Sequence, residues 1–337
     1  MVTLKDIARE AGVSITTVSN VIHKRKSRVS PVLVDKIWKI IEREHYAPSM
    51  SARSLAQERS SIIGVITHLT PQNTGSTLGD PFFGSFVDSI EKRIRDEGYY
   101  LMIRAVEDAR ELAALSHSWQ LSGLILTGMF QDDFFLTTKE IGIPFVLIDS
   151  YVDDPEVCCV GLEDEEGSRM ATRHLLDNGH RVIAFASPAI RPGGVIDKRL
   201  QGYRRALEEA GVPFDPALIF TQEITVEEGK KLGRLLAEKP GITGVVTSAD
   251  ILAAGIMAGL NECGIRVPED KSIVGFDDNY LARLTLPALT TVHQDADRKG
   301  ILATDMLLKQ IAKDPIPQRN VILPVRLVER GSVQKRC

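Results

Sequence analysis

The side chains with the clearest chemistry lie near the start of the chain. One short segment carries polar or methyl-bearing side chains at Ile15, Thr16, Thr17 and Asn20. Such side chains suit the base edges and thymine methyl groups of a DNA major groove. The basic run 24–28 follows at once and suits contacts to phosphates. A small solvated helical bundle used for protein contacts is the alternative interpretation, since charge runs are usually only solvated.

Two short helices and a tight turn are needed to present these side chains to a groove. Thr3 predicts the N-cap of a first helix, and Gly12 predicts its end, because glycine readily adopts a left-handed turn. Ser14 predicts the cap of a second helix over 15–22, and Pro31 predicts the first turn of a third. This arrangement is typical of a helix-turn-helix.

Composition fits a globular chain of two or three domains. It has 337 residues, 43% of them hydrophobic, and a net charge of −4. The charge is uneven: residues 1–60 hold 11 Lys/Arg against 6 Asp/Glu, whereas the remainder holds 30 against 39. A basic head on an acidic body indicates that only the head meets a polyanion. Without a signal sequence or an apolar run of about 20 residues, the chain is expected in the cytoplasm, away from membranes.

From residue 61 onward, apolar strands alternate with amphipathic helices. We expect strands near 62–67, 100–105, 123–127, 145–149, 157–161, 182–186, 244–248 and 272–276. This alternation predicts an α/β body with parallel sheets covered on both faces, and ligand sites beyond the carboxyl ends of the strands.

No catalytic or metal-binding pattern stands out. The chain lacks a P-loop, a Gly-x-Gly-x-x-Gly motif, a His-Glu-x-x-His motif and a Gly-x-Ser-x-Gly motif. Its four cysteines, at 158, 159, 263 and 337, lack metal-ligand spacing and are interpreted as reduced thiols. We therefore expect no enzyme activity, no cofactor and no metal. An α/β enzyme and a free solute-binding protein are the competing classes; the head and the missing signal sequence oppose the second.

Several strings resemble the LacI/GalR (lactose/galactose repressor) family of bacterial transcriptional regulators. They include TLKDIAREAGVSITTVSNVI and HYAPSMSARSL in the head, and RLQGYRRALEEAG and GIRVPEDKSIVGFDD in the body. The resemblance implies an all-α helix-turn-helix head and a two-lobed body like the periplasmic binding proteins. It implies a head over 1–47, a hinge helix and linker over 48–60, a first lobe over 61–161 plus 294–320, and a second lobe over 162–293 plus 321–331.

The same resemblance implies a ligand-responsive regulator, most simply a repressor, that binds a palindromic operator as a homodimer. Leu55 would be an apolar wedge in the minor groove. The implied DNA-binding residues are Thr3, Ser14, Ile15, Thr16, Thr17, Asn20, Lys24, Arg28, Tyr46, Ala52, Leu55 and Ala56. The chain departs from the family at His23 and Ile15, which leaves the operator sequence open.

The resemblance also implies an effector site between the lobes, with a sugar or sugar derivative as the first candidate. The implied site residues are Asp80, Phe82, Phe83, Asp149, Arg199, Asp277 and Gln294. Carboxylates accept from hydroxyls, a guanidinium donates to them, and phenyl rings cover a sugar ring. Each of these residues also has a purely structural interpretation. The two phenyl rings could pack in the core, Asp80 could cap a helix, and the Asp149 side chain could form a hydrogen bond within a turn.

Departures within the body keep other effectors open. Ile224 and Ala249 stand where an aromatic residue and an asparagine are common in the family, Leu162-Glu163 replaces an Asp-Asn pair, and the loop Pro188–Asp197 is long. A nucleobase or nucleoside, or a phosphorylated carrier protein, is the alternative effector. Asp250 is expected only to cap a helix.

Overall fold

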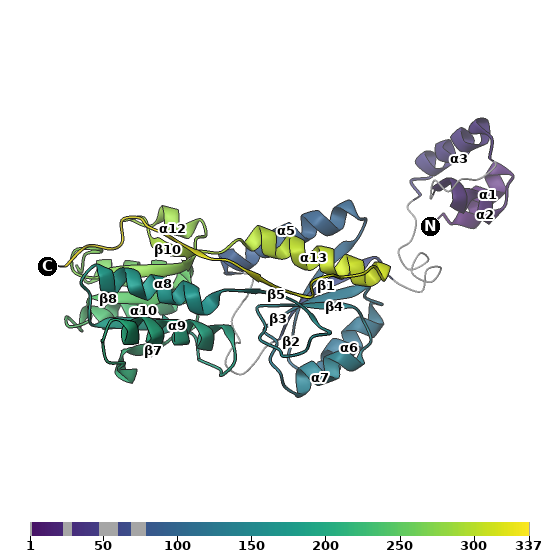
Figure 1. The fold of residues 1–337 in the computed structure, drawn as a ribbon. Coiled ribbons are helices and arrows are strands. Elements are labelled where there is room, and N and C mark those ends of the chain that lie inside the picture. The colour runs from purple at the N-terminus through teal and green to yellow at the C-terminus, as the bar shows by residue number, and fades with distance from the viewer. Residues whose placement is uncertain (1, 23–28, 47–59, 69–78, 337) are drawn as a thin grey trace. The chain divides into compact units, whose positions relative to one another are not determined.

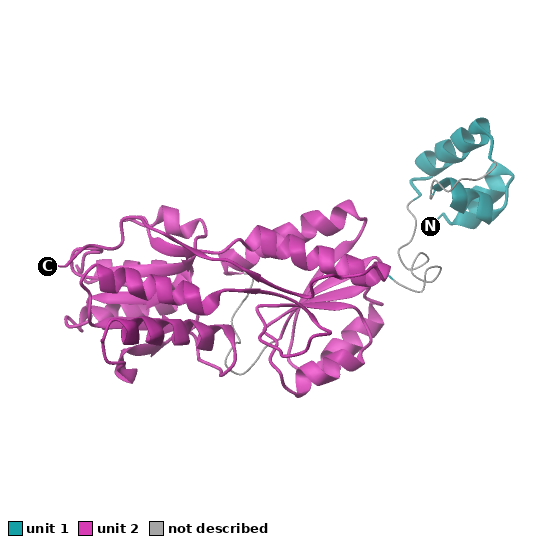
Figure 2. Cartoon of the chain, viewed as in Figure 1, with its two compact units in different colours: residues 1–60 teal, residues 61–337 magenta. Residues whose placement is uncertain are grey.

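The computed structural model describes residues 2–22, 29–46, 60–68 and 79–336. The chain divides into two compact units, Met1–Ser60 and Ser61–Cys337, which Figure 2 colours separately. Each unit has its own core, and each is described by itself below.

The described residues of the first unit form a bundle of three helices, as the capping residues predict. They are α1 (Leu4–Ala11), α2 (Ile15–Ile22) and α3 (Pro31–Arg43). The Thr3 hydroxyl accepts from the Asp6 backbone N–H while the Asp6 carboxylate accepts from the Thr3 N–H, a reciprocal capping box. Gly12 ends α1 with φ at 74°, in the left-handed region where glycine is favoured.

A small apolar core and two polar contacts fix these helices to one another. Ile7, Val18 and Ile37 supply one fully buried side chain from each helix. The Lys36 ammonium donates to the carbonyl of Ala11 at 3.1 Å and so satisfies the end of α1. The bundle therefore holds α2 firmly, with one side left toward solvent.

The described residues of the second unit form two six-stranded sheets, and we call each sheet with its helices a lobe (Figure 1). The first sheet has the order β11-β5-β4-β3-β1-β2, and all its pairs are parallel. Its strands are β1 (Ile62–His68), β2 (Tyr100–Val106), β3 (Gly123–Thr127), β4 (Phe145–Ile148), β5 (Cys158–Leu162) and β11 (Asn320–Leu323). Helices α5 (Pro81–Asp96) and α13 (Ala296–Ala312) cover one face, and α6 (Ala109–Ser118) and α7 (Asp133–Glu140) cover the other.

The second sheet has the order β12-β10-β9-β8-β6-β7. Its strands are β6 (Ile183–Ser187), β7 (Ile219–Thr221), β8 (Gly244–Thr247), β9 (Ser272–Asp277), β10 (Thr290–His293) and β12 (Arg326–Val328). Only β12 runs antiparallel to its neighbour. Helices α8 (Asp164–Asp177) and α9 (Val195–Glu209) cover one face of this sheet, and α10 (Val226–Ala237) and α11 (Asp250–Glu262) cover the other. The lobe also contains a short 3-10 helix, η2 (Pro216–Leu218), and the short helix α12 (Leu281–Leu284).

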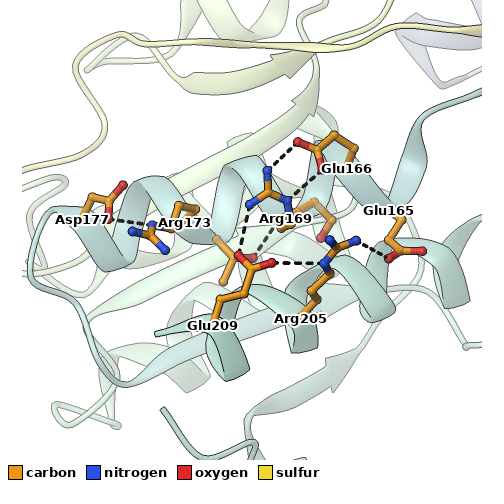
Figure 3. Close-up of polar contacts among 9 residues, drawn as sticks. Glu165, Glu166, Arg169, Arg173, Asp177, Arg205 and Glu209 are labelled. Carbon is orange, nitrogen blue, oxygen red and sulfur yellow. Dashed lines mark hydrogen bonds and ion pairs between the residues drawn. The ribbon is translucent and has the colours of Figure 1, made fainter. Parts of the chain in front are cut away.

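Each helix pair of the second lobe is joined in its own way. Between α10 and α11, Gly229, Gly233, Gly255 and Gly259 let the two backbones approach closely; a Cβ at Gly255 would lie 2.4 Å from the Val226 carbonyl oxygen. Between α8 and α9, charged side chains form the network of Figure 3, in which the Arg169 guanidinium joins Glu166 and Glu209 at 2.7 and 3.2 Å. These partly exposed pairs contribute little stability individually.

The α/β class with parallel sheets covered on both faces is confirmed, but the strand list is incomplete. It omits β7, β10, β11 and β12, which have only three or four residues each. The chain passes between the sheets after β5, after β10 and between β11 and β12. The implied division assigns residues 321–323 to the second lobe, whereas they lie in the first sheet because they pair in parallel with residues 160–162.

Candidate functional site

The exposed side of α2 carries the side chains that the sequence singles out for DNA. Ile15 is 47% exposed despite being apolar, and Thr16 is exposed beside it. Thr17 and Asn20 are half-buried, because the same helix buries Val18 against α1 and α3. This face is therefore an apolar and hydroxyl-bearing surface on a rigid helix, which is the form of a groove-reading surface.

The remaining predicted DNA-binding residues of the head include two helix caps and one side chain that packs on the core. The Ser14 hydroxyl accepts from the Thr17 backbone N–H at 3.1 Å, so it caps α2, as Thr3 caps α1. Tyr46 is half-buried against the head core. The predicted contacts at Lys24, Arg28, Ala52, Leu55 and Ala56 lie outside the described residues.

In the second unit, six of the seven predicted effector residues lie in or beside one buried polar network. Its centre is Lys299 on α13, whose side chain is fully buried. The Lys299 ammonium donates to both carboxylate oxygens of Asp149 at 2.8 Å and to the Gln294 amide oxygen at 2.9 Å. The Gln294 amide nitrogen then donates to Asp277 at 2.6 Å. This chain of bonds runs from the end of β4 in the first lobe to the end of β9 in the second.

Arg199 at the start of α9 forms the second half of the network. Its guanidinium donates from Nε to Asp164 at 2.8 Å and from Nη1 to the Ser248 carbonyl at 2.5 Å, and it lies 3.6 Å above the centre of the Phe276 ring. The Tyr151 hydroxyl donates to the other Asp164 oxygen at 2.7 Å. Arg199 is 7% exposed, so its position is fixed by these contacts.

The loop that begins α5 supplies the last predicted residues. Asp80 caps α5 by accepting from the Phe82 backbone N–H at 3.0 Å, and it lines a cavity of about 380 Å³ that also borders Tyr280. The Phe82 ring lies 5.0 Å from the Lys299 nitrogen and is half-buried. Phe83 is 6% exposed and belongs to the core of the first lobe, where it packs on Phe86.

We name the interlobe cluster as Asp80, Asp149, Asp164, Arg199, Asp277, Gln294 and Lys299. Burial raises the pKa of Asp80, Asp149 and Asp277. For Asp277, the neighbouring carboxylates of Asp250 and Asp80 raise the pKa further. Burial works against the charged form of Arg199, but the carboxylates around it raise the pKa of its guanidinium.

Sequence reasoning missed Lys299 and Asp164 and assigned Asp250 too small a role. A signal for Lys299 exists, because residues 299, 303, 306 and 307 form the buried stripe of α13 and only the first is charged. Asp250 does not cap α11, since Ala249 occupies the cap position. The Asp250 carboxylate instead accepts from the Thr291 hydroxyl at 2.5 Å and from the Asn279 N–H at 3.0 Å. Asn279 follows Asp277 and Asp278, which both take positive φ.

The long loop between β6 and α9 reaches the first lobe. The Arg191 guanidinium donates to Asp132 at 2.7 Å and lies 3.7 Å from the centre of the Phe130 ring. Both ion-pair partners are about one-third exposed. The two lobes thus touch here as well as through the interlobe cluster.

No helix among the described residues is long and apolar enough to cross a membrane. In the same residues, no three His, Cys, Asp or Glu side chains gather in a way that could hold a metal ion.

A helix-turn-helix head and a two-lobed body with polar side chains at the carboxyl ends of its strands define a class of regulators that couple ligand binding to DNA binding. Residues 3–49 match the model described as bacterial regulatory proteins, lacI family, and residues 172–333 match a periplasmic binding protein-like domain. The chain is 33% identical over 342 residues to the ribose operon repressor of Halalkalibacterium halodurans, covering 99% of this chain and 98% of that protein. It is 32% identical to the HTH-type transcriptional repressor PurR of Edwardsiella ictaluri, covering 99% and 97%.

A solved structure of the Lac repressor dimer bound to operator and the anti-inducer ONPF has a TM-score of 0.83 and 27% identity, with 99% of each chain covered. The chain therefore belongs to the lacI family of bacterial regulatory proteins. The family resemblance inferred from the head and body strings is confirmed.

Proposed function

We propose that this protein is a ligand-responsive transcriptional repressor that binds a palindromic operator as a homodimer in the cytoplasm. Family membership and the exposed face of α2 support this function. The Lac repressor in the similar structure is a dimer on its operator, which supports the same assembly here. In this proposal residues 1–47 read DNA, 48–60 form the hinge, and the two lobes bind the effector. No catalytic role is assigned to any residue.

In the proposed complex α2 lies in the major groove. Ile15, Thr16, Thr17 and Asn20 face base edges, while Lys24 and Arg28 meet phosphates. Leu55 enters the minor groove as a wedge when two hinge segments meet. Leu55→Ala is then expected to lower affinity for the specific operator while salt-dependent nonspecific binding persists; equal loss of both would remove the wedge role.

The effector is proposed to bind where the carboxyl ends of the two sheets meet. The observation that carries this proposal is the interlobe cluster, in which groups from both lobes gather with Arg199 and Phe82. A sugar or sugar derivative is the first candidate, since carboxylates and a guanidinium suit hydroxyl groups. A nucleobase or nucleoside is the second, favoured by the similarity to PurR.

Regulation follows if the effector binds two lobe arrangements unequally. A difference of about 1–3 kcal/mol between the free energies of effector binding to the two arrangements is typical of such coupling. Because the hydrogen bond from Lys299 to Gln294 joins α13 of the first lobe to the residue that follows β10 of the second, a ligand that replaces this bond changes how the lobes are joined. In the proposed dimer this change alters the spacing of the two hinge segments, and with it the affinity for the operator.

Two measurements on the full chain test the function. Fluorescence anisotropy with labelled genomic fragments is expected to give specific binding, which a free solute-binding protein would not give. Thermal-shift measurements with D-ribose, D-glucose, hypoxanthine and adenosine are expected to find a stabilising compound that also changes the anisotropy curve. Stabilisation without any effect on DNA binding would contradict ligand-responsive repression.

A further inference from the structure

Residues 188–194 connect β6 to α9 in the second lobe and lie against the first lobe. We propose that they form an interlobe latch, which joins the two lobes before any effector is bound and whose release separates the lobes around the interlobe cluster. The latch consists of Arg191 and Gly194 with their partners Phe130 and Asp132. This inference goes beyond the proposed function, because the latch acts without a ligand and its test needs none.

Arg191 makes two contacts of different kinds with the first lobe. Its guanidinium donates from Nη2 to Oδ2 of Asp132 at 2.7 Å and lies 3.7 Å from the centre of the Phe130 ring. A planar guanidinium can stack on a ring and still donate from its edge to a carboxylate. The other Asp132 oxygen accepts from the Phe135 N–H at 3.2 Å, because Asp132 caps α7. The cap therefore holds the carboxylate in the position where Arg191 meets it.

The backbone of the latch lies against the same ring. A Cβ at Gly194 would be 2.8 Å from the Phe130 ring, closer than real side chains approach. Gly193 has a φ of 75°, in the left-handed region, and its N–H donates to the Asp197 carboxylate at 2.9 Å. The Gly194 N–H donates to the Arg191 carbonyl at 3.2 Å and closes a turn. The two glycines thus allow a tight turn that places both the backbone and Arg191 on the first lobe.

One helix connects the latch to the interlobe cluster. Gly194 is the N-cap of α9, and Arg199 lies in the second turn of that helix. Between them, the Lys198 ammonium lies 5.6 Å from the centre of the ring of Tyr151, which follows β4 of the first lobe. A rotation that lifts the start of α9 from the first lobe therefore breaks the latch and displaces Arg199 in the same movement.

The exposure of the ion pair sets the strength of the latch. The side chains of Arg191 and Asp132 keep 35% and 29% of their surface exposed, so water and salt weaken their attraction. An ion pair of this kind changes an equilibrium by up to about fivefold. Removal of the Arg191 side chain should therefore raise the ratio of separated to joined lobes by about two- to fivefold. In the parent protein, added salt should raise the same ratio.

Hydrogen exchange of the full chain without ligand measures release of the latch. Arg191→Ala should speed the exchange of backbone amides in residues 130–136 and 194–199 by about two- to fivefold, and a second substitution, Phe130→Ala, should speed it further. The control is Arg173→Ala, which removes a similarly exposed ion pair with Asp177 within α8. It should leave both segments unchanged. Unchanged exchange in Arg191→Ala would overturn the inference.

A distance between the lobes distinguishes their separation from fraying of residues 188–194 alone. Fluorophores would be attached at Leu136→Cys on α7 and Leu235→Cys on α10, two exposed positions in different lobes, in a chain that also carries Cys263→Ser and Cys337→Ser. We expect single-molecule energy transfer to show a population with separated lobes that grows with salt. With Arg191→Ala added, this population should be larger and respond less to salt. Faster hydrogen exchange without any change in the distances would overturn the inference and leave the proposed function intact.

Discussion

Lys299→Met is the substitution that tests most sharply what stabilises the centre of the interlobe cluster. It preserves the length and most of the volume of the side chain but removes an ammonium that is fully buried. The variant loses two hydrogen bonds to Asp149 and one to Gln294. Breaking a buried ion pair by removing one partner costs about 3–5 kcal/mol. Because the Asp149 side chain keeps 21% of its surface exposed and can recruit water, we expect the lower end, about 3 kcal/mol.

The assay is thermal and urea unfolding of the full chain, followed by circular dichroism. A loss of about 3 kcal/mol corresponds to a fall in Tm of roughly 6–12 °C for a body of this size. Lys309→Met, on an exposed position of the same helix, is the matched control and should change little. The double variant Lys299→Met with Asp149→Asn should recover part of the loss, since no unpaired charge stays buried. If Lys299→Met behaved like the control, the buried ion pair with Asp149 would not stabilise the fold.

Three further substitutions probe other parts of the second unit. Arg191→Ala should lower the free energy of unfolding by less than about 1 kcal/mol, since its ion pair is one-third exposed. A double-mutant cycle with Asp132→Ala should give a coupling energy above zero. If the effects of the two substitutions on stability simply added, the contact between these side chains would be contradicted. Gly255→Ala should destabilise the protein by about 1–3 kcal/mol, because the added methyl group would collide with a backbone carbonyl of α10. Gly241→Ala is the control and should be tolerated, because a Cβ there would meet open space. Similar Tm values for the two variants would refute the close contact between α10 and α11. Burial raises the pKa of Asp250 to about 7, so its stabilising contribution is present at low pH and is lost as the pH rises toward 7. The free energy of unfolding of Asp250→Asn relative to that of the parent should therefore increase from pH 5 by about 1.4 kcal/mol per pH unit and level off above pH 7; a constant difference would contradict the shift.

The head was predictable because its signals are local. Thr3, Gly12, Ser14 and Pro31 each mark a helix end through contacts within four residues, and the structure places the ends accordingly. Strands of three or four residues were missed for the opposite reason: β11 and β12 are defined by partners more than 30 residues away in sequence, and no periodic pattern develops in so short a run.

In the candidate site, too, the features set by local sequence could be predicted, and those set by partners distant in the chain could not. Asp80, Asp149 and Asp277 follow strands or precede a helix, so their positions could be inferred from the order of elements. Their partners could not, since Lys299 is 150 residues from Asp149 in the chain and only the folded sheet brings them together. A buried lysine on an apolar helical stripe marks such a partner but does not identify the carboxylate it meets.

The central claim is that α2 reads DNA under control of a ligand held between the lobes. DNase I footprinting of the full chain on fragments of its own genome, with and without a stabilising compound from the ligand screen, tests it directly. The account predicts protection of a palindromic site with half-sites about one helical turn apart, with occupancy that the compound changes. A Thr16→Ala, Thr17→Ala variant should lose that protection while it retains weak nonspecific binding. Absence of any protected site under both conditions would contradict the account.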